Sequence, residues 1–119
     1  MGTILLVDDS TFMRSLYRVL LEQSALTIVG EASNGVEGVD AYKEHNPDVV
    51  VMNIRMPVLD GISVTEKIMA YDPDAAIVIC SGNAQEEKII EAKQAGAVDY
   101  ITKPFQRDSF LQAVTAPVE

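Results

Sequence analysis

Cysteine and long apolar runs are scarce in this chain, and each scarcity excludes a class of protein. Cys80 is the single cysteine among 119 residues, which excludes an intramolecular disulfide. The longest apolar runs are strand-sized and too short to span a bilayer. The Met-Gly-Thr start also lacks the charged-then-apolar pattern of a secretion signal. We therefore expect a cytoplasmic domain that makes no membrane contact.

Basic residues are also few, with 9 lysines and arginines against 18 acidic residues and a formal net charge of −9. Phosphate backbones repel a net anion, and no run of lysine or arginine overrides that repulsion. Nucleic acid is therefore not expected as a partner. The 48% hydrophobic content is that of an ordinary globular protein. The length fits one domain, covering residues 1–119, and we expect a monomer.

Short apolar runs recur every 21 to 28 residues, as in a repeating strand and helix pattern. The runs start at Ile4, Thr27, Val49, Ile77 and Val98. Those at 4–7, 49–52 and 77–80 are continuous and rich in β-branched residues, without polar alternation. Strands buried on both faces have this composition, which favours a parallel sheet.

The segments between these runs have helical periodicity. In the first of them, Phe12, Leu16, Val19 and Leu20 follow helical spacing and predict an apolar helix face. Asp9 or Ser10 can cap this helix. Five strand and helix units with right-handed crossovers predict an α/β fold with a doubly wound, five-stranded parallel sheet and helices on both faces.

Two later helices carry further signals. Asn34 with Glu37 three residues on resembles a capping box for the second helix, in which Gly38 costs about 1 kcal/mol relative to alanine. The last helix is expected to be short, from about 106 to 114. Residues 115–119 are expected to form a tail, because Pro117 disfavours a helical residue before it.

Polar residues follow four of the predicted strands at the point where each strand ends. These residues are Asp8-Asp9, Asn53, Ser81 and Lys103. The carboxyl ends of parallel strands meet at one edge of the sheet, where ligands bind in doubly wound folds. Adjacent carboxylates are ligands of the kind that Mg²⁺ takes, and a lysine with a serine can hold phosphoryl oxygens. The pattern predicts a site that holds or transfers a phosphoryl group.

Several stretches of the chain are similar to the receiver domains of two-component response regulators, especially the single-domain chemotaxis regulators. The matching stretches are Ile4-Leu5-Leu6-Val7-Asp8-Asp9-Ser10, Met13-Arg14, Gly30-Glu31-Ala32-Ser33-Asn34-Gly35, Met52-Asn53-Ile54-Arg55-Met56-Pro57, Asp60-Gly61, Ala95-Gly96-Ala97 and Tyr100-Ile101-Thr102-Lys103-Pro104-Phe105. As a set, they are specific to that family, and the resemblance extends over nearly the whole chain.

The resemblance implies a flavodoxin-like strand order 2-1-3-4-5 and a role for each matching residue. It implies that Asp8, Asp9, position 53 and the backbone carbonyl of Arg55 bind Mg²⁺. Ser81 resembles the switch hydroxyl, Tyr100 the switching aromatic residue, and Lys103 the phosphate-binding lysine, followed by a cis bond to Pro104. The implied partners are a sensor histidine kinase and an output protein that binds the face between the fourth and fifth helices.

Position 53 departs from the family pattern, because Asn53 stands where the family has its phosphoryl-accepting aspartate. An amide oxygen carries no full negative charge and is not expected to form an acyl phosphate, so no enzymatic activity is expected. With Mg²⁺ bound, the formal charges of Asp8, Asp9, Lys103 and the metal sum to +1, where an aspartate at position 53 would make zero. We therefore expect metal binding to be weakened but not lost.

Two explanations of Asn53 remain open. One is a near-isosteric substitution introduced to hold a competent receiver unphosphorylated. The other is a natural receiver-like module that binds partners without phosphate. The explanation by an introduced substitution is favoured, because the chain retains the other matching site residues, Asp8, Asp9, Ser81, Tyr100 and Lys103. A flavin carrier of the same fold is disfavoured, because the acidic pair after the first strand would repel a flavin phosphate.

Overall fold

Strands and helices alternate along the whole computed structural model, which describes residues 2–83 and 85–119. The elements are β1 (Gly2–Val7), α1 (Thr11–Leu21), β2 (Leu26–Ala32), α2 (Gly35–His45), β3 (Val49–Met52), α3 (Gly61–Tyr71), β4 (Ile77–Ser81), α4 (Glu86–Ala95), β5 (Asp99–Thr102), α5 (Arg107–Thr115) and the 3₁₀ helix η1 (Ala116–Val118). All strand pairs are parallel, in the order β2-β1-β3-β4-β5. The predicted fold class and strand order are confirmed.

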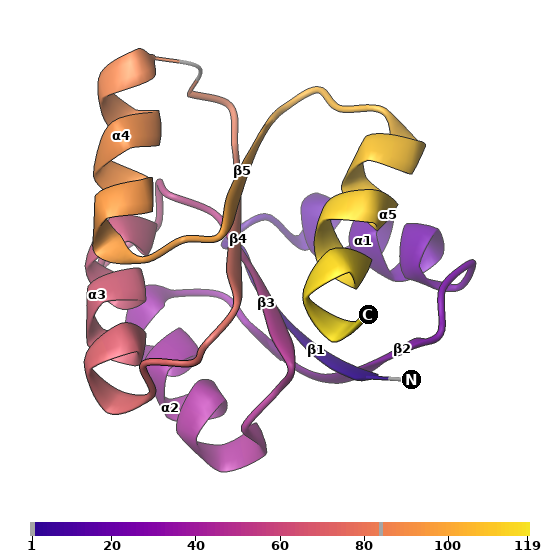
Figure 1. Ribbon diagram of the computed structural model, residues 1–119, viewed down its shortest axis with the longest axis horizontal. Helices are drawn as coiled ribbons and strands as arrows, with labels where there is room; N and C mark the ends of the chain where they lie inside the picture. Colours follow the sequence, from indigo (N-terminus) through magenta and orange to yellow (C-terminus); the bar gives the residue numbers. More distant parts are fainter. Residues whose placement is uncertain (1, 84) are drawn as a thin grey trace.

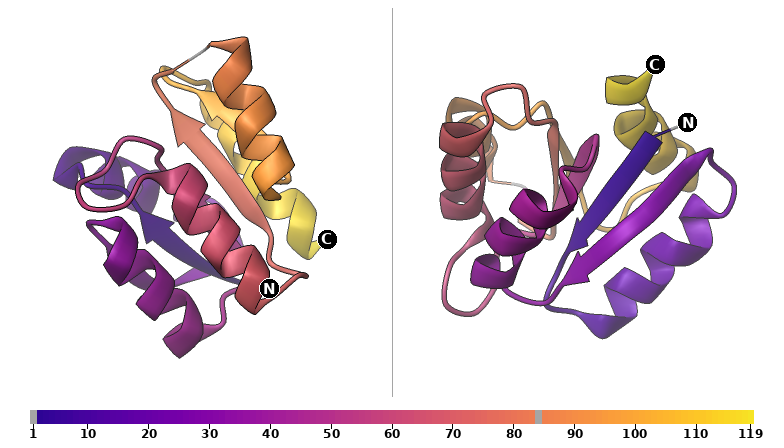
Figure 2. Two further views of the ribbon diagram at one scale, coloured as in Figure 1. Left: turned by 90° about the vertical axis from the view of Figure 1, so that its left-hand side faces the viewer. Right: turned by 90° about the horizontal axis from the view of Figure 1, so that it is seen from below.

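The sheet lies between two layers of helices, with α2, α3 and α4 on one face and α1 and α5 on the other (Figures 1 and 2). Side chains alternate between the faces along each central strand, so each layer has its own core. Leu5 and Val50 pack with Tyr42 and Ile68 on the first face. On the second face, the core around Tyr17 and Phe110 contains Ile4, Leu6, Val49 and Val51. The central strands are therefore buried on both sides, as their composition predicts.

Helix α1 forms where predicted but buries a different face. Phe12 and Val19 are 73% and 60% exposed, whereas Tyr17 and Leu21 are buried and Met13 packs beside them. The expected apolar face is therefore correct at Leu20, which packs against the core, and wrong at Phe12 and Val19. The reason is that Tyr17 stacks on Phe110 of α5 at a ring separation of 5.3 Å, which turns its side of α1 toward the sheet.

The C-terminal residues also differ from expectation. Thr115 is the last residue of α5, and the residues predicted to form a tail continue as the 3₁₀ helix η1. Val118 in η1 packs against the core of the α1 and α5 layer. Its side chain also lies close to Gly2, so the two ends of the described chain are neighbours (Figure 1).

Helix caps form at the predicted positions. The Ser10 hydroxyl accepts a hydrogen bond from the Met13 amide at 3.1 Å, and the Asn34 side chain accepts one from the Glu37 amide at 2.9 Å. Gly38 fits the inner face of α2, because a Cβ there would lie 2.9 Å from a Val7 methyl group. Close packing against β1 therefore accounts for a residue that the helix alone disfavours.

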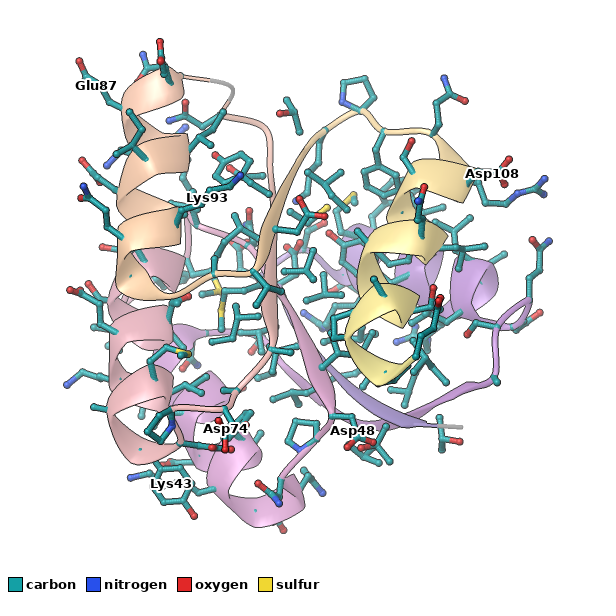
Figure 3. All side chains as sticks on the ribbon, in the orientation of Figure 1. Lys43, Asp48, Asp74, Glu87, Lys93 and Asp108 are labelled. Carbon is teal, nitrogen blue, oxygen red and sulfur yellow. The ribbon has the colours of Figure 1, made fainter. Side chains whose placement is uncertain are left out.

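Charged side chains lie on the outside of both helical layers, as Glu87 on α4 and Asp108 on α5 illustrate (Figure 3). No helix within residues 2–83 and 85–119 combines the length and apolar character needed to cross a bilayer.

Gly61→Ala is expected to lower the free energy of unfolding by about 3 kcal/mol. Gly61 is the first residue of α3 and lies against the end of β3, and a Cβ at this position would overlap the backbone oxygen of Asn53. Backbone cannot yield as a flexible side chain does. Gly82→Ala is the matched control, because a Cβ there meets no atom within 4 Å. Urea unfolding that gave equal losses for both variants would contradict this placement of α3.

Candidate functional site

The strand register brings the predicted polar residues to one edge of the sheet. Val7 pairs with Met52, so Asp8 and Asn53 are the residues that follow two paired strand ends. Ser81 pairs with Thr102, and the Lys103 amide donates to the Ser81 carbonyl at 2.8 Å. The backbone N–H of Asn53 likewise donates to the Val7 carbonyl at 2.9 Å. Backbone hydrogen bonds thus fix the separations of the site residues.

Asp8 is completely buried, and both of its carboxylate oxygens have partners. Oδ1 accepts from the Ser10 amide at 2.9 Å. Oδ2 accepts from Lys103 Nζ at 3.1 Å and from the Tyr17 hydroxyl at 3.3 Å. A buried carboxylate is stable when paired and hydrogen-bonded in this way. In this structure, the ammonium group of Lys103 therefore pairs with the buried carboxylate of Asp8.

Asn53 is at the centre of the site, with only 9% of its surface exposed. Its side-chain nitrogen donates to Asp9 Oδ1 at 3.2 Å and to the Arg55 carbonyl at 2.9 Å. Its side-chain oxygen accepts from Lys103 Nζ at 3.5 Å. The opposite amide orientation would set an oxygen against two acceptors and an NH₂ group against an ammonium group. The surrounding charges therefore select the observed orientation.

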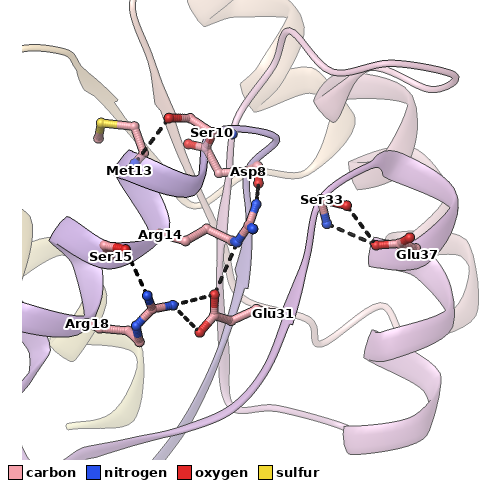
Figure 4. A network of polar contacts seen from close by, with 9 residues as sticks. All are labelled: Asp8, Ser10, Met13, Arg14, Ser15, Arg18, Glu31, Ser33 and Glu37. Atoms are coloured by element: carbon pink, nitrogen blue, oxygen red, sulfur yellow. Dashed lines mark hydrogen bonds and ion pairs between the residues drawn. The ribbon is translucent and has the colours of Figure 1, made fainter.

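Arg14 holds the loop that carries the acidic pair (Figure 4). Its Nη1 donates to the Asp8 carbonyl at 2.6 Å, and its Nε pairs with Glu31 on β2 at 3.1 Å. Glu31 also binds Arg18 through both carboxylate oxygens, at 2.6 and 2.5 Å. Helix α1 is thereby tied to β2 and to the backbone of Asp8.

Ser81 and Tyr100 meet at the loop after β4. The buried Ser81 hydroxyl accepts from the Asn83 amide at 3.1 Å. The Tyr100 hydroxyl donates to the Asn83 carbonyl at 2.5 Å, which joins β5 to this loop. An open cleft of about 1120 Å³ lies between this loop and the loop after β3, and its lining includes Asn53, Arg55, Ser81 and Lys103.

Some predicted site residues lie outside that cleft, and some of its neighbours were not predicted. Asp8, Asp9 and Tyr100 do not line it, although Asp8 and Asp9 reach it through Lys103 and Asn53. Asp60 and Lys88 do line it. Sequence reasoning also missed Tyr17 at Asp8, because the predicted apolar face of α1 excluded it. The sequence signal that could have identified Tyr17 as an inward-facing residue is its position one helical turn after Met13.

Most of the oxygen atoms expected to hold Mg²⁺ already accept hydrogen bonds from protein donors, the exception being Asp9 Oδ2 on an exposed side chain. Asp9 Oδ1 and the Arg55 carbonyl accept from the Asn53 amide, and both oxygens of Asp8 have partners. In the part of the chain that the structure describes, no three histidine, cysteine or carboxylate side chains form a metal cluster. The donor types suit a hard cation, but the Asn53 NH₂ group stands against two of them, Asp9 Oδ1 and the Arg55 carbonyl, where a cation would bind.

Tyr17→Phe is expected to flatten the decline of stability at high pH. Burial raises the pKa of the Tyr17 hydroxyl well above its usual value, and nearby Cys80 and Asp8 add to the increase. Above about pH 10 the unfolded chain releases this proton while the folded chain keeps it. The free energy of unfolding then falls by about 1.4 kcal/mol per pH unit for such a group.

Tyr42 is expected to lower stability at high pH in the same way, because burial and the hydrogen bond to Asp72 raise the pKa of its hydroxyl. Tyr42→Phe is therefore the comparison variant, and the double variant is expected to remove both contributions. Urea unfolding at about pH 9, 10 and 11 measures these slopes. An unchanged slope in Tyr17→Phe would show that its hydroxyl is not held protonated by the fold.

The chain is similar to chemotaxis proteins in sequence and in structure. The response regulator receiver domain model matches residues 4–115. The chemotaxis protein CheY of Halobacterium salinarum is 51% identical over 112 residues, covering 94% of this chain and 92% of that protein. CheY of Bacillus subtilis is 46% identical over 111 residues, covering 93% of this chain and 92% of that protein.

A solved structure gives the same result. The structure of the CheX-CheY-BeF₃-Mg²⁺ complex from Borrelia burgdorferi matches with a TM-score of 0.93 at 32% identity, covering 98% of this chain and 89% of that one. Receiver domains act in two-component signalling, generally bind Mg²⁺ for their phosphorylation, and interact with histidine kinases and output proteins. The family match, the relatives and the fold together establish that this chain belongs to the response regulator receiver domain family, with CheY-like relatives.

Proposed function

We propose that this chain is a chemotaxis-type receiver domain in which Asn53 stands at the phosphoryl-acceptor position and holds the domain unphosphorylated. The observation that supports this most directly is the placement of the Asn53 amide between Asp9, the Arg55 carbonyl and Lys103. An aspartate there would put a nucleophilic oxygen in the same place with almost no change of volume.

The chemistry of the pocket favours phosphoryl transfer once a carboxylate is present. A carboxylate oxygen attacks phosphorus with its full negative charge, which the amide of Asn53 lacks. Lys103 and Ser81 lie across the cleft and would hold phosphoryl oxygens through an ammonium group and a hydroxyl. Mg²⁺, bound by Asp8, Asp9, position 53 and the Arg55 carbonyl, would supply positive charge to those oxygens.

The proposed partners are a sensor histidine kinase and an output protein. The output surface in this proposal is the face from α4 to α5, as the family resemblance implies. Tyr100 supports it, because its hydroxyl links β5 to the Asn83 carbonyl in the loop between the cleft and α4. Ile90 on α4 is 47% exposed and offers an apolar contact on that helix.

A phosphorylated chemotaxis histidine kinase tests this proposal. We expect Asn53→Asp to discharge the kinase, with loss of label from its phosphohistidine at a rate at least about a hundredfold above that with the unmodified chain. The double variant Asn53→Asp with Lys103→Met serves as a control for the pocket and is expected to be slower. If Asn53→Asp folds and discharges no kinase, an interaction module that works without phosphate becomes the better account.

A further inference from the structure

We propose that the side-chain NH₂ group of Asn53 is a built-in substitute for the divalent cation, so that this receiver holds its metal ligands closed without metal. The inference rests on the proposed function, since it takes Asp9 and the Arg55 carbonyl as the ligand side of the pocket. It adds that position 53 does more than lack a nucleophile, because its amide also competes with the cation.

The two hydrogen bonds of Asn53 Nδ2 carry this inference. A primary amide nitrogen has two N–H bonds, and here each has its own acceptor, Asp9 Oδ1 at 3.2 Å and the Arg55 carbonyl at 2.9 Å. These oxygens come from different loops, after β1 and after β3. One donor group therefore bridges them, as a cation between two oxygen ligands would.

Lys103 keeps the amide in this orientation. Its ammonium group lies 3.5 Å from Asn53 Oδ1, on the side away from Asp9 and the Arg55 carbonyl. The carbonyl end of the amide therefore faces a positive charge, and the NH₂ end faces a carboxylate and a carbonyl. Turning the amide to offer its oxygen to a cation would break both hydrogen bonds that its NH₂ group donates. It would also set the NH₂ group against the Lys103 ammonium group and the oxygen against two acceptors.

The consequence is a competition between the amide and the cation for the same oxygens. A cation that binds Asp9 Oδ1 and the Arg55 carbonyl meets oxygens that already accept from the Asn53 NH₂ group, and one of these hydrogen bonds is to a charged group. Such a bond contributes about 1.5–3 kcal/mol, equivalent to about tenfold or more in affinity. Removing the amide therefore strengthens cation binding, even though no negative charge is added.

Magnesium titration of three chains tests this competition, with Mg²⁺ alone as the probe and calorimetry as the readout. Asn53→Ala is expected to bind Mg²⁺ about tenfold more tightly than the unmodified chain, and Asn53→Asp more tightly again. An account based on charge alone expects the unmodified chain and Asn53→Ala to be equal, because both are neutral at this position. Asn46→Gly, which removes an exposed amide at the opposite edge of the sheet, is the control and should not change the affinity.

The outcomes separate this inference from the proposed function. If Asn53→Asp binds Mg²⁺ tightly but Asn53→Ala binds no better than the unmodified chain, the competition is wrong and the receiver site stands. If Asn53→Asp also fails to gain affinity, the assignment of the metal side is wrong, and the inference is overturned with it.

A measurement on the unmodified chain does not depend on any variant folding. The side-chain NH₂ signals of Asn53 in nitrogen-15 NMR spectra are expected to shift during Mg²⁺ titration with the same midpoint as the backbone amide of Arg55. Unchanged Asn53 side-chain signals at Mg²⁺ saturation would overturn the inference, because the cation would then bind without displacing the amide.

Discussion

Asn53→Asp is expected to lower the free energy of unfolding by about 3–5 kcal/mol when no divalent cation is present. The change replaces an NH₂ donor by a charged oxygen that faces Asp9 Oδ1 and the Arg55 carbonyl, both of which are acceptors. Position 53 is 9% exposed, so water cannot solvate the added charge fully. Asp8, Asp9 and Lys103 already leave a formal charge of −1, and the variant makes it −2.

Mg²⁺ is expected to restore most of this loss, because a cation that binds only the folded state adds stability by mass action. Urea unfolding with chelator and with Mg²⁺ measures both effects. Asn46→Asp makes the same chemical change at an exposed helix C-cap and is expected to lose no more than about 1 kcal/mol of stability, the same amount with chelator and with Mg²⁺. If Asn53→Asp were as stable as the unmodified chain in chelator, the contacts of the Asn53 side chain with Asp9 and the Arg55 carbonyl would be contradicted.

The sheet and its functional edge were predictable from the sequence because both depend on short-range patterns. The β-branched runs at 49–52 and 77–80 are nearly free of polar residues, so their burial on both faces follows from composition. In a parallel sheet, residues that follow the strands share one edge, which is enough to bring Asp8, Asn53 and Lys103 together. The cis bond between Lys103 and Pro104, expected from the family resemblance, is present.

The side chains that shape the site were harder to predict, because they depend on contacts between distant elements. Tyr17 turns inward through stacking on Phe110, 93 residues further along the chain. The orientation of the Asn53 amide depends on Lys103, Asp9 and Arg55 at once, and no local pattern encodes it. The 3₁₀ helix after α5 likewise depends on the packing of Val118 against the core.

Asn53→Asp is also expected to become phosphorylated by a small phosphodonor. A small phosphodonor such as acetyl phosphate delivers its phosphoryl group without a kinase, so the reaction depends on the pocket alone. Asn53→Asp is expected to gain one phosphoryl group, because a carboxylate would then face Lys103 and Ser81 across the cleft. The gain is expected to require Mg²⁺, which receiver domains generally bind for phosphorylation. The unmodified chain is expected to gain none, because its amide oxygen lacks the charge to attack phosphorus.

Intact-mass measurement of both chains after incubation with acetyl phosphate and Mg²⁺ tests most directly whether Asn53 alone blocks a competent receiver site. We expect the added mass of one phosphoryl group on Asn53→Asp, mapped by peptide analysis to position 53, and no added mass on the unmodified chain. An unlabelled Asn53→Asp chain that folds and binds Mg²⁺ would contradict the account. A labelled unmodified chain, with the phosphoryl group on another residue such as Ser81, would also contradict it.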